Sequence, residues 1–131
     1  MARVFIIEDD TMMGECLELA TRAGLQKVQN HSKTEHNIEK FTNIFDVMPV
    51  INSHLPDLII LDILLSGPDG FTLLNELMTY HDTAQIPVII VSSLDLSGQD
   101  LSSYGVICTL QKETMMPQQL SAAIQGALNH A

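Results

Sequence analysis

Short, continuous apolar runs recur along the chain, and segments with helical spacing separate them. The clearest runs are "RVFII" at residues 3–7, "LPDLIILDI" at 55–63, "IPVIIVSS" at 86–93 and "GVICTLQK" at 105–112. A strand that is apolar without alternation is buried on both faces, as in a parallel sheet covered by helices. Strands that alternate with helices form βαβ units with right-handed crossovers. The pattern therefore predicts an α/β fold, with a parallel sheet between two helical layers.

Three of the intervening segments have a clear helical pattern. One helix is predicted to begin at Asp10 or Thr11 and to end near Gly24, with apolar positions at Met13, Cys16, Leu17 and Ala20. The apolar positions of the other two are Phe71, Leu74, Leu77 and Met78, and then Leu120, Ala123, Ile124, Ala127 and Leu128, with Thr114 as the cap of the last helix. We expect these apolar faces to cover the sheet.

The remaining segments give weaker signals. A weak strand is expected over residues 28–32, and the polar stretch "SKTEHNIEKFTN" at 32–43 is interpreted as a loop or an irregular insertion. The segment "IFDVMPVINSHL" at 44–55 predicts a helix in which Pro49 lies in the first turn or introduces a kink. The segment "DLSGQDLSSYG" at 95–105 is a poor helix former because it contains Gly98 and several serines.

Length and charge limit the possible functions. The chain has 131 residues, of which 46% are hydrophobic, so we expect one domain over residues 1–131 with a substantial core. A formal charge of −10 with only six Lys and Arg argues against a nucleic-acid surface and favours a basic or phosphorylated partner or a bound cation. The longest apolar run, "LIILDILL", is interrupted by Asp62 and is too short for a membrane span.

Cysteine usage and the N-terminal segment indicate a cytoplasmic protein. Cys16 and Cys108 lie in apolar segments without a CxxC motif, so we expect two buried, reduced thiols. The segment "MARVFII" has too short an apolar stretch for a signal peptide. We therefore expect the chain in the cytoplasm and away from membranes.

Polar residues stand where each predicted strand ends. Glu8 and Asp9 follow the first run and Asp62 follows "LIIL", while Ser92 and Lys112 end the last two runs. In parallel α/β sheets the carboxyl ends of the strands form the functional crevice, so these side chains are expected to meet there. Three carboxylates in one crevice repel each other unless a cation neutralises them, and their hard oxygens suit Mg²⁺. The hydroxyl and the ammonium could bind an anion beside the metal, such as a phosphoryl group. The neighbouring Asp10 is expected only to cap a helix.

These motifs, taken in order, resemble the receiver domain of two-component response regulators (CheY-like). The resemblance rests on "IIEDD" for the acid pair, "PDLIILDI" with "GPDG" for the acceptor strand and its loop, "PVIIVSS" for the hydroxyl and "GV…LQK" for the lysine. It covers essentially the whole chain and implies a three-layer, flavodoxin-like (βα)5 fold whose five parallel strands have the order 2-1-3-4-5.

The resemblance also implies a role for each residue of the crevice. Asp62 would be the phosphoacceptor, taking a phosphoryl group from a kinase phosphohistidine or a small phosphodonor. The implied Mg²⁺ ligands are Asp9, Asp62 and the backbone carbonyl of Leu64, with Glu8 acting through metal-bound water. Lys112 would pair with the phosphoryl oxygens, and Ser92 would donate a hydrogen bond to them after transfer.

The implied function is a phosphorylation-dependent switch rather than an enzyme. Its partners would be a sensor histidine kinase or phosphotransfer protein and a downstream protein, with no nucleic acid or membrane bound by this chain. Mg²⁺-dependent phosphatases and nucleases also gather acids at strand ends, but they need an Asp-x-Asp pair, which neither Glu8-Asp9 nor Asp62 with Ile63-Leu64 provides. A receiver-like adaptor that binds its partner without phosphorylation remains the alternative.

Two departures from the family pattern, at Glu113 and Thr109, keep this alternative open, and a separate feature bears on the lifetime of the acyl phosphate. Glu113 follows Lys112 where the family has proline after a cis peptide bond, so the loop either carries a strained cis bond or runs trans and aims the lysine differently. Thr109 stands where the family often has an aromatic residue that rotates inward on phosphorylation. Leu64 and Leu94 flank the expected path of the hydrolytic water, which suggests a slowly hydrolysed acyl phosphate.

Overall fold

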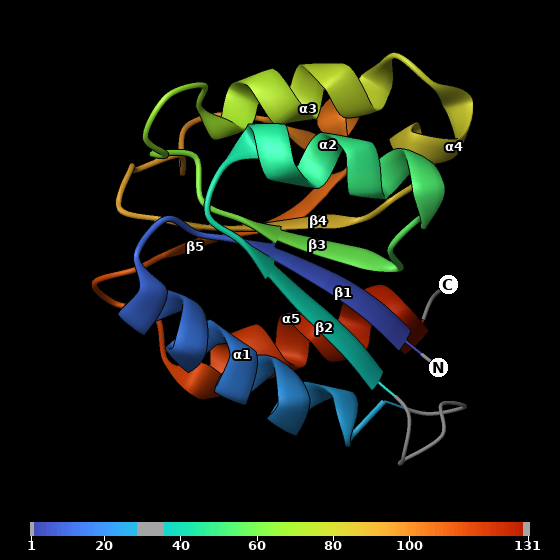
Figure 1. Cartoon of the computed structure of the whole chain (residues 1–131). Helices are drawn as coiled ribbons and strands as arrows, with labels where there is room; N and C mark the ends of the chain where they lie inside the picture. The colour runs from blue at the N-terminus through green and yellow to red at the C-terminus, as the bar shows by residue number, and fades with distance from the viewer. Residues whose placement is uncertain (1, 29–35, 130–131) are drawn as a thin grey trace.

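Five parallel strands form one sheet between two layers of helices (Figure 1). The computed structural model describes residues 2–28 and 36–129. The strands are β1 (Ala2–Ile7), β2 (His36–Phe41), β3 (Leu58–Leu61), β4 (Val88–Ser92) and β5 (Val106–Gln111), in the spatial order β2-β1-β3-β4-β5. The helices are α1 (Thr11–Leu25), α2 (Ile44–Ser53), α3 (Gly70–Met78), α4 (His81–Ala84) and α5 (Pro117–Asn129). The predicted α/β class and strand order are both confirmed.

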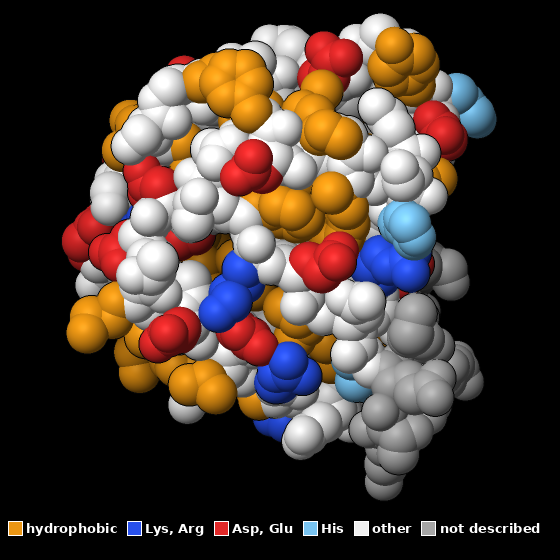
Figure 2. All heavy atoms as spheres, viewed as in Figure 1, with side chains coloured by type: hydrophobic (Ala, Val, Ile, Leu, Met, Phe, Trp, Pro, Cys, Tyr) orange, Lys and Arg blue, Asp and Glu red, His pale blue; other side chains and the backbone are white. Residues whose placement is uncertain are grey.

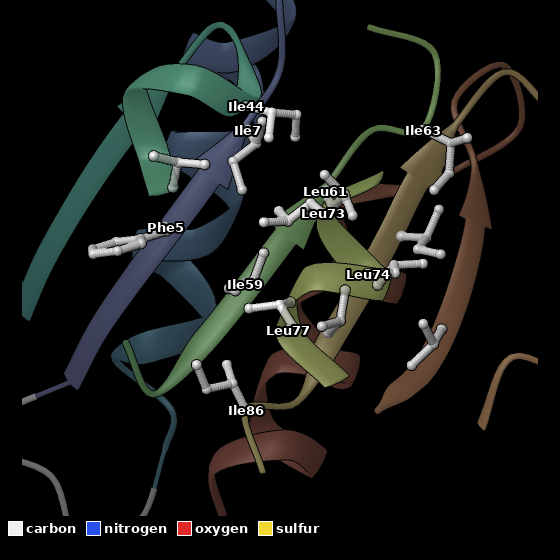
Figure 3. Packing of buried hydrophobic residues seen from close by; sticks show 14 of the residues in the cluster. Phe5, Ile7, Ile44, Ile59, Leu61, Ile63, Leu73, Leu74, Leu77 and Ile86 are labelled. Atoms are coloured by element: carbon white, nitrogen blue, oxygen red, sulfur yellow. The ribbon is translucent and has the colours of Figure 1, made fainter. Parts of the chain in front are cut away.

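The central strands are apolar throughout because both of their faces are covered. Helices α1 and α5 lie on one face of the sheet, and α2, α3 and α4 lie on the other (Figure 1). In β1, Val4 and Ile6 pack toward α1 and α5, whereas Phe5 and Ile7 pack toward α2 and α3. Figure 3 shows Leu61 of β3 beside Leu73 of α3, and Ile7 of β1 beside Ile44 of α2, in this second cluster. Burial on both sides therefore holds the strand ends in fixed positions.

Helix α1 begins as predicted but presents a different face. The Asp10 carboxylate accepts hydrogen bonds from the backbone N–H groups of Met12 and Met13, which caps the helix. The buried positions are Gly14, Leu17, Thr21, Gly24 and Leu25. At Gly24 a Cβ would lie 3.2 Å from the Cα of Ser121, so the glycine permits close packing on α5. This contact turns Cys16 to the surface, and the prediction of a buried Cys16 is wrong; Cys108 is half-buried.

The second strand lies where the sequence was interpreted as a loop or insertion. Residues His36–Phe41 pair with β1 along its whole length, from Ala2 opposite His36 to Ile7 opposite Phe41. The loop prediction is wrong for this segment because an edge strand is held by backbone pairing on one side and tolerates half-buried polar residues. Of the weak strand expected over residues 28–32, Val28 lies outside any strand, and positions 29–32 lie outside the described residues.

The place of Pro49 in α2 and the start of α5 differ from the predictions. Helix α2 begins at Ile44 as predicted, behind Asn43, which accepts a hydrogen bond from the Asp46 N–H. Pro49 lies at its sixth position, so placing the proline in the first turn is wrong. Thr114 does not cap α5, which begins at Pro117, because proline suits the first helical position. The Gln119 side chain accepts a hydrogen bond of 2.7 Å from the Met116 N–H at this end.

The segment between β4 and β5 contains no α-helix, as its serines and Gly98 predicted. Its regular structure is a single 3₁₀ turn over Ser102–Tyr104, and Leu96 and Leu101 anchor the rest to the core. A short helix that was not predicted, α4, precedes β4 instead. The connection from β4 to β5 is therefore a loop with one 3₁₀ turn rather than an α-helix.

Candidate functional site

The polar residues expected at the strand ends do lie together at one edge of the sheet. Backbone hydrogen bonds extend the pairing one residue past the strands: the N–H of Asp62 donates to Ile7 O at 3.0 Å, and that of Lys112 donates to Ser92 O at 3.0 Å. Carboxylate oxygens of Glu8, Asp9 and Asp62 all lie within 4.8 Å of one another. The ends of β1, β3, β4 and β5 thus deliver three acids, a hydroxyl and an ammonium to one crevice.

Lys112 pairs with two buried acids at once. Its Nζ lies 2.7 Å from Oδ2 of Asp62 and 2.6 Å from Oε1 of Glu8. The side chains of Glu8 and Asp62 are 1% and 2% exposed, and that of Lys112 is 15% exposed. Water screens these charges weakly, so the ammonium offsets much of the repulsion between the carboxylates.

The ionisation of Glu8 and Lys112 reflects this burial. Burial raises the pKa of the Glu8 carboxyl above its ordinary value, and the hydrogen bond to Lys112 only partly opposes that effect. Burial alone would lower the pKa of the Lys112 ammonium, but its hydrogen bonds to Asp62 and Glu8 and their charges raise it. The lysine therefore stays charged while it contacts both acids.

Asp9 lies nearer the surface and is held by a residue that the sequence analysis missed. The backbone N–H and the hydroxyl of Ser66 both donate to Asp9 Oδ2 at 3.1 Å. Burial alone would raise the pKa of the Asp9 carboxyl, but these hydrogen bonds lower it. The signal in the sequence was the turn segment "LSGPDG", in which Ser66 follows the acceptor strand by only a few residues.

The loop after β3 brings Leu64 to the acceptor carboxylate. The Leu64 N–H donates to Asp62 Oδ1 at 3.0 Å, and the Leu64 side chain is 50% exposed. The Gly70 N–H donates to Ile63 O at 2.9 Å and closes the loop onto α3. Each carboxylate oxygen of Asp62 thus accepts one hydrogen bond, Oδ1 from the Leu64 N–H and Oδ2 from the Lys112 ammonium.

The hydroxyl side of the crevice is built by the ends of β4 and β5. Ser92 is 1% exposed, and its Oγ accepts a hydrogen bond of 3.3 Å from the Leu94 N–H. Thr109 is exposed and lines a pocket of about 110 Å³ with Ile90 and Leu96 beneath the loop after β4. No bulky side chain at position 109 fills this pocket.

The peptide bond after Lys112 is trans, since the described residues contain no cis peptide. Of the two expectations for Glu113, the strained cis bond is therefore wrong. With the trans bond, the Lys112 ammonium contacts the Asp62 carboxylate, and an aim of the lysine that differs from the family's stays a prediction. The Glu113 side chain instead accepts a hydrogen bond from Ser93 at 2.5 Å.

The donor atoms of the acid trio fit a hard divalent cation. Glu8, Asp9 and Asp62 offer only carboxylate oxygens, and no histidine or cysteine of the described ranges joins them. Mg²⁺ prefers a few such oxygens and keeps several waters, whereas Zn²⁺ favours nitrogen and sulfur. A carboxylate beside a cation and an ammonium can attack a phosphoryl group as a nucleophile.

The whole arrangement matches a known family. The profile of the response regulator receiver domain matches residues 4–125 of the chain. The chain belongs to this family. Receiver domains are phosphorylation-based signalling switches of two-component systems, and they interact with histidine kinases or phosphotransfer proteins and with effectors.

Two bacterial regulatory proteins are similar in sequence to this receiver domain over most of its length. The transcriptional regulatory protein BaeR of Escherichia coli is 31% identical over 131 aligned residues, which cover 96% of this chain and 48% of BaeR. Protein PilH of Pseudomonas aeruginosa is 29% identical over 96 residues, covering 72% of this chain and 70% of PilH. The receiver chain thus spans about half the length of BaeR.

Solved structures share the fold over nearly the whole receiver chain. A response regulator from Chloroflexus aurantiacus superposes with a TM-score of 0.77 at 24% identity, covering 97% of both chains. The Mn²⁺-bound form of response regulator Rcp1 gives a TM-score of 0.67 at 22% identity, covering 96% of this chain and 91% of that one. No helix in the described part of the receiver is both long and apolar enough to cross a membrane.

Proposed function

We propose that residues 1–131 form a single receiver domain in which Asp62 accepts a phosphoryl group in a Mg²⁺-dependent reaction. The observation that carries this proposal is the 2.7 Å contact between Lys112 Nζ and Asp62 Oδ2 within a trio of acids, of which Glu8 and Asp62 are buried and Asp9 is half-buried. The arrangement suits a nucleophile beside groups that neutralise an incoming phosphoryl group.

Each residue of the crevice has a role in this reaction. Asp9, Asp62 and the Leu64 carbonyl would hold Mg²⁺, with Glu8 acting through bound water. The ion would neutralise charge on the carboxylates and on the phosphoryl oxygens. A carboxylate oxygen of Asp62 forms the new bond to phosphorus, while the bond from phosphorus to the donor breaks and its electron pair leaves with the donor. The product is an acyl phosphate on Asp62.

Lys112 and Ser92 act on the phosphoryl oxygens. In the resting chain Lys112 neutralises Asp62 and Glu8, and it moves only a short distance to pair with a phosphoryl oxygen. The Ser92 hydroxyl accepts a hydrogen bond from Leu94 and retains its own proton to donate. Transfer would draw Ser92 toward Asp62 and thereby move the loop after β4, which is the change that a partner reads.

The surface around the crevice fits a protein phosphodonor, either a sensor histidine kinase or a phosphotransfer protein. Exposed apolar side chains lie on the loops and first helical turns that follow the strands: Met12, Phe45, Leu64, Leu94 and Met116. Figure 2 shows acidic and hydrophobic side chains along the left edge of the molecule, where the strands end in Figure 1. A surface that combines acidic and apolar side chains in this way is suited to contact with another protein. A downstream protein would bind the same domain in the cytoplasm.

Phosphorylation of the purified chain tests the proposal directly. Incubation with acetyl phosphate and Mg²⁺ should add one phosphoryl group to the intact mass, and EDTA should prevent the addition. Asp62→Asn should remove it completely, because an amide is not a nucleophile here. Asp57→Asn, at the other end of β3, is the matched control and should react like the unaltered chain. A phosphoryl group that survives Asp62→Asn would refute the assignment.

A second function is favoured by the trans bond at Glu113 and by the loop that replaces a helix between β4 and β5. The domain would then be an adaptor that binds its partner without phosphorylation. In that case neither acetyl phosphate nor beryllofluoride would change its mass or melting temperature. The two functions are therefore separated by the same experiment.

A further inference from the structure

Two loops of the crevice are joined by a side-chain hydrogen bond. Ser93 directly follows β4, and Glu113 directly follows Lys112 in the loop after β5. The Ser93 hydroxyl donates to Glu113 Oε2 at 2.5 Å, across 20 positions of sequence. A hydrogen bond to a charged carboxylate is stronger than one between neutral groups. The bond is therefore a candidate constraint on both loops.

This bond continues the pairing of β4 with β5 beyond the ends of the strands. The last paired residues are Ser92 and Gln111, and the Lys112 N–H then donates to Ser92 O at 3.0 Å. The Ser93 to Glu113 contact is the next link in the same direction. Ser92 and Lys112, the two residues proposed to bind the phosphoryl group, thus lie between the sheet and this outer link.

The next backbone hydrogen bonds after Lys112 stay within the β5 loop. The N–H groups of Thr114 and Met115 donate to Gln111 O at 3.2 and 2.9 Å, so they shape the β5 loop but do not join it to the β4 loop. Lysine carries its charge on a long stem with several rotatable bonds. The position of its ammonium relative to the Ser92 hydroxyl therefore depends on how firmly the two backbones are joined.

We propose that Glu113 is a positioning residue that acts through Ser93 to hold the Ser92 hydroxyl and the Lys112 ammonium at the spacing needed for phosphoryl transfer. This inference rests on the proposed function of Asp62. Glu113 itself touches neither Asp62 nor the acids Glu8 and Asp9 among the contacts in the described structure. It should therefore affect transfer without affecting metal binding.

The test compares Glu113→Ala, Ser93→Ala and the double variant. Each single variant should slow phosphorylation of Asp62 by acetyl phosphate at saturating Mg²⁺ about three- to ten-fold, the range for loss of one hydrogen bond. The double variant should be no slower than either single variant, because both remove the same bond. Mg²⁺ affinity, measured by calorimetry, should stay unchanged in all three.

Two further variants separate positioning from general destabilisation. Glu113→Gln keeps an oxygen acceptor for the Ser93 hydroxyl and should restore most of the rate. Ser97→Ala is the matched control, because the Ser97 hydroxyl bonds to Asp95 within the same loop at 2.7 Å and does not bridge to β5. Additive losses in the double variant, no rescue by glutamine, or an equal loss in the Ser97 variant would each overturn the proposal.

Hydrogen exchange provides a readout without any phosphodonor. The Lys112 amide, which donates to Ser92 O, should exchange faster in Glu113→Ala and Ser93→Ala but not in Ser97→Ala. If the unaltered chain takes no phosphoryl group, the proposed function fails, while this exchange still reports on the link. Unchanged exchange at Lys112 in both variants would overturn the link itself.

Discussion

The ammonium of Lys112 lies 2.7 Å from the Asp62 carboxylate, although 50 positions separate the two residues in the chain. The same ammonium contacts Glu8 at 2.6 Å. The ammonium of Lys112 thus contacts two buried carboxylates that would otherwise repel each other. A cation bound by these carboxylates would compete with the ammonium. Removal of Lys112 should consequently have opposite effects on stability and on metal binding.

Lys112→Met should lower the free energy of unfolding in metal-free buffer by about 3 kcal/mol, the lower end for breaking a buried ion pair. Mg²⁺ should bind more tightly to this variant and restore much of the lost stability, while phosphorylation of Asp62 should become much slower. Urea unfolding with and without Mg²⁺, together with calorimetry, measures these effects. Lys27→Met on the surface is the control, and weaker Mg²⁺ binding by Lys112→Met would contradict the competition.

The pH dependence of stability should carry the signature of Glu8. Burial raises the pKa of this carboxyl above 4.5, so the folded chain binds its proton more tightly than the unfolded chain. The resulting stabilisation is complete below pH 4.5 and is lost as the pH rises through the raised pKa. Asp9, with a lowered pKa, acts in the opposite sense and only below pH 3.8.

In metal-free buffer, Glu8→Gln should therefore flatten the decrease in unfolding free energy that accompanies a rise in pH above 4.5. Urea unfolding at several pH values measures the slope. Glu76→Gln on the exposed face of α3 is the matched control and should leave the slope unchanged. An equally steep slope in the Glu8 variant would show that other groups cause it.

The lifetime of the acyl phosphate should depend on two leucines beside the crevice. Leu64 and Leu94 are 50% and 39% exposed and offer no hydrogen bond to an attacking water. Replacing both with Asn or Glu should speed loss of the phosphoryl group about ten-fold, which corresponds to about 1.4 kcal/mol of activation free energy. Decay of the phosphorylated mass over time measures the rate. The control is Leu55→Asn, because Leu55 is 42% exposed and lies before β3. An unchanged lifetime in the double variant would refute the role of Leu64 and Leu94 in slowing hydrolysis.

Gly70 should be essential for the loop that carries Asp62. A Cβ at this position would lie 2.8 Å from Asp62 O and from Ile63 Cα, which are backbone atoms with little freedom to move. Gly70→Ala should cost about 2 to 3 kcal/mol, as overpacking does, and should slow phosphorylation. Thermal unfolding measures the loss. Gly126→Ala, whose Cβ meets nothing within 4 Å, should instead stabilise α5 by about 0.5 to 1 kcal/mol. Equal effects in the two variants would contradict the packing argument.

The parts of the fold that follow from local pattern were predictable. The strands β1, β3 and β4 lie in the apolar runs because each is buried on both faces, and the polar residues at the strand ends indicated the crevice. The expectation of burial on both faces is wrong for β5, an edge strand in which Ile107 is 50% exposed. The edge strand β2 was missed because its support comes from pairing with β1, and pairing with a distant segment leaves little trace in composition. The exposure of Cys16 was missed for a related reason, since the packing of α1 on α5 decides which helix face is buried.

The sequence by itself determined which strand-end residues reach the site, because a parallel sheet gathers the carboxyl ends of its strands at one edge. Only the tertiary structure decided which atoms meet there. Three sets of contacts join residues from different loops: the ion pairs of Lys112 with Asp62 and Glu8, the hydrogen bond from Ser66 to Asp9, and the hydrogen bond from Ser93 to Glu113. Such contacts depend on distances set by the packing of the whole sheet, which no local pattern of residues contains.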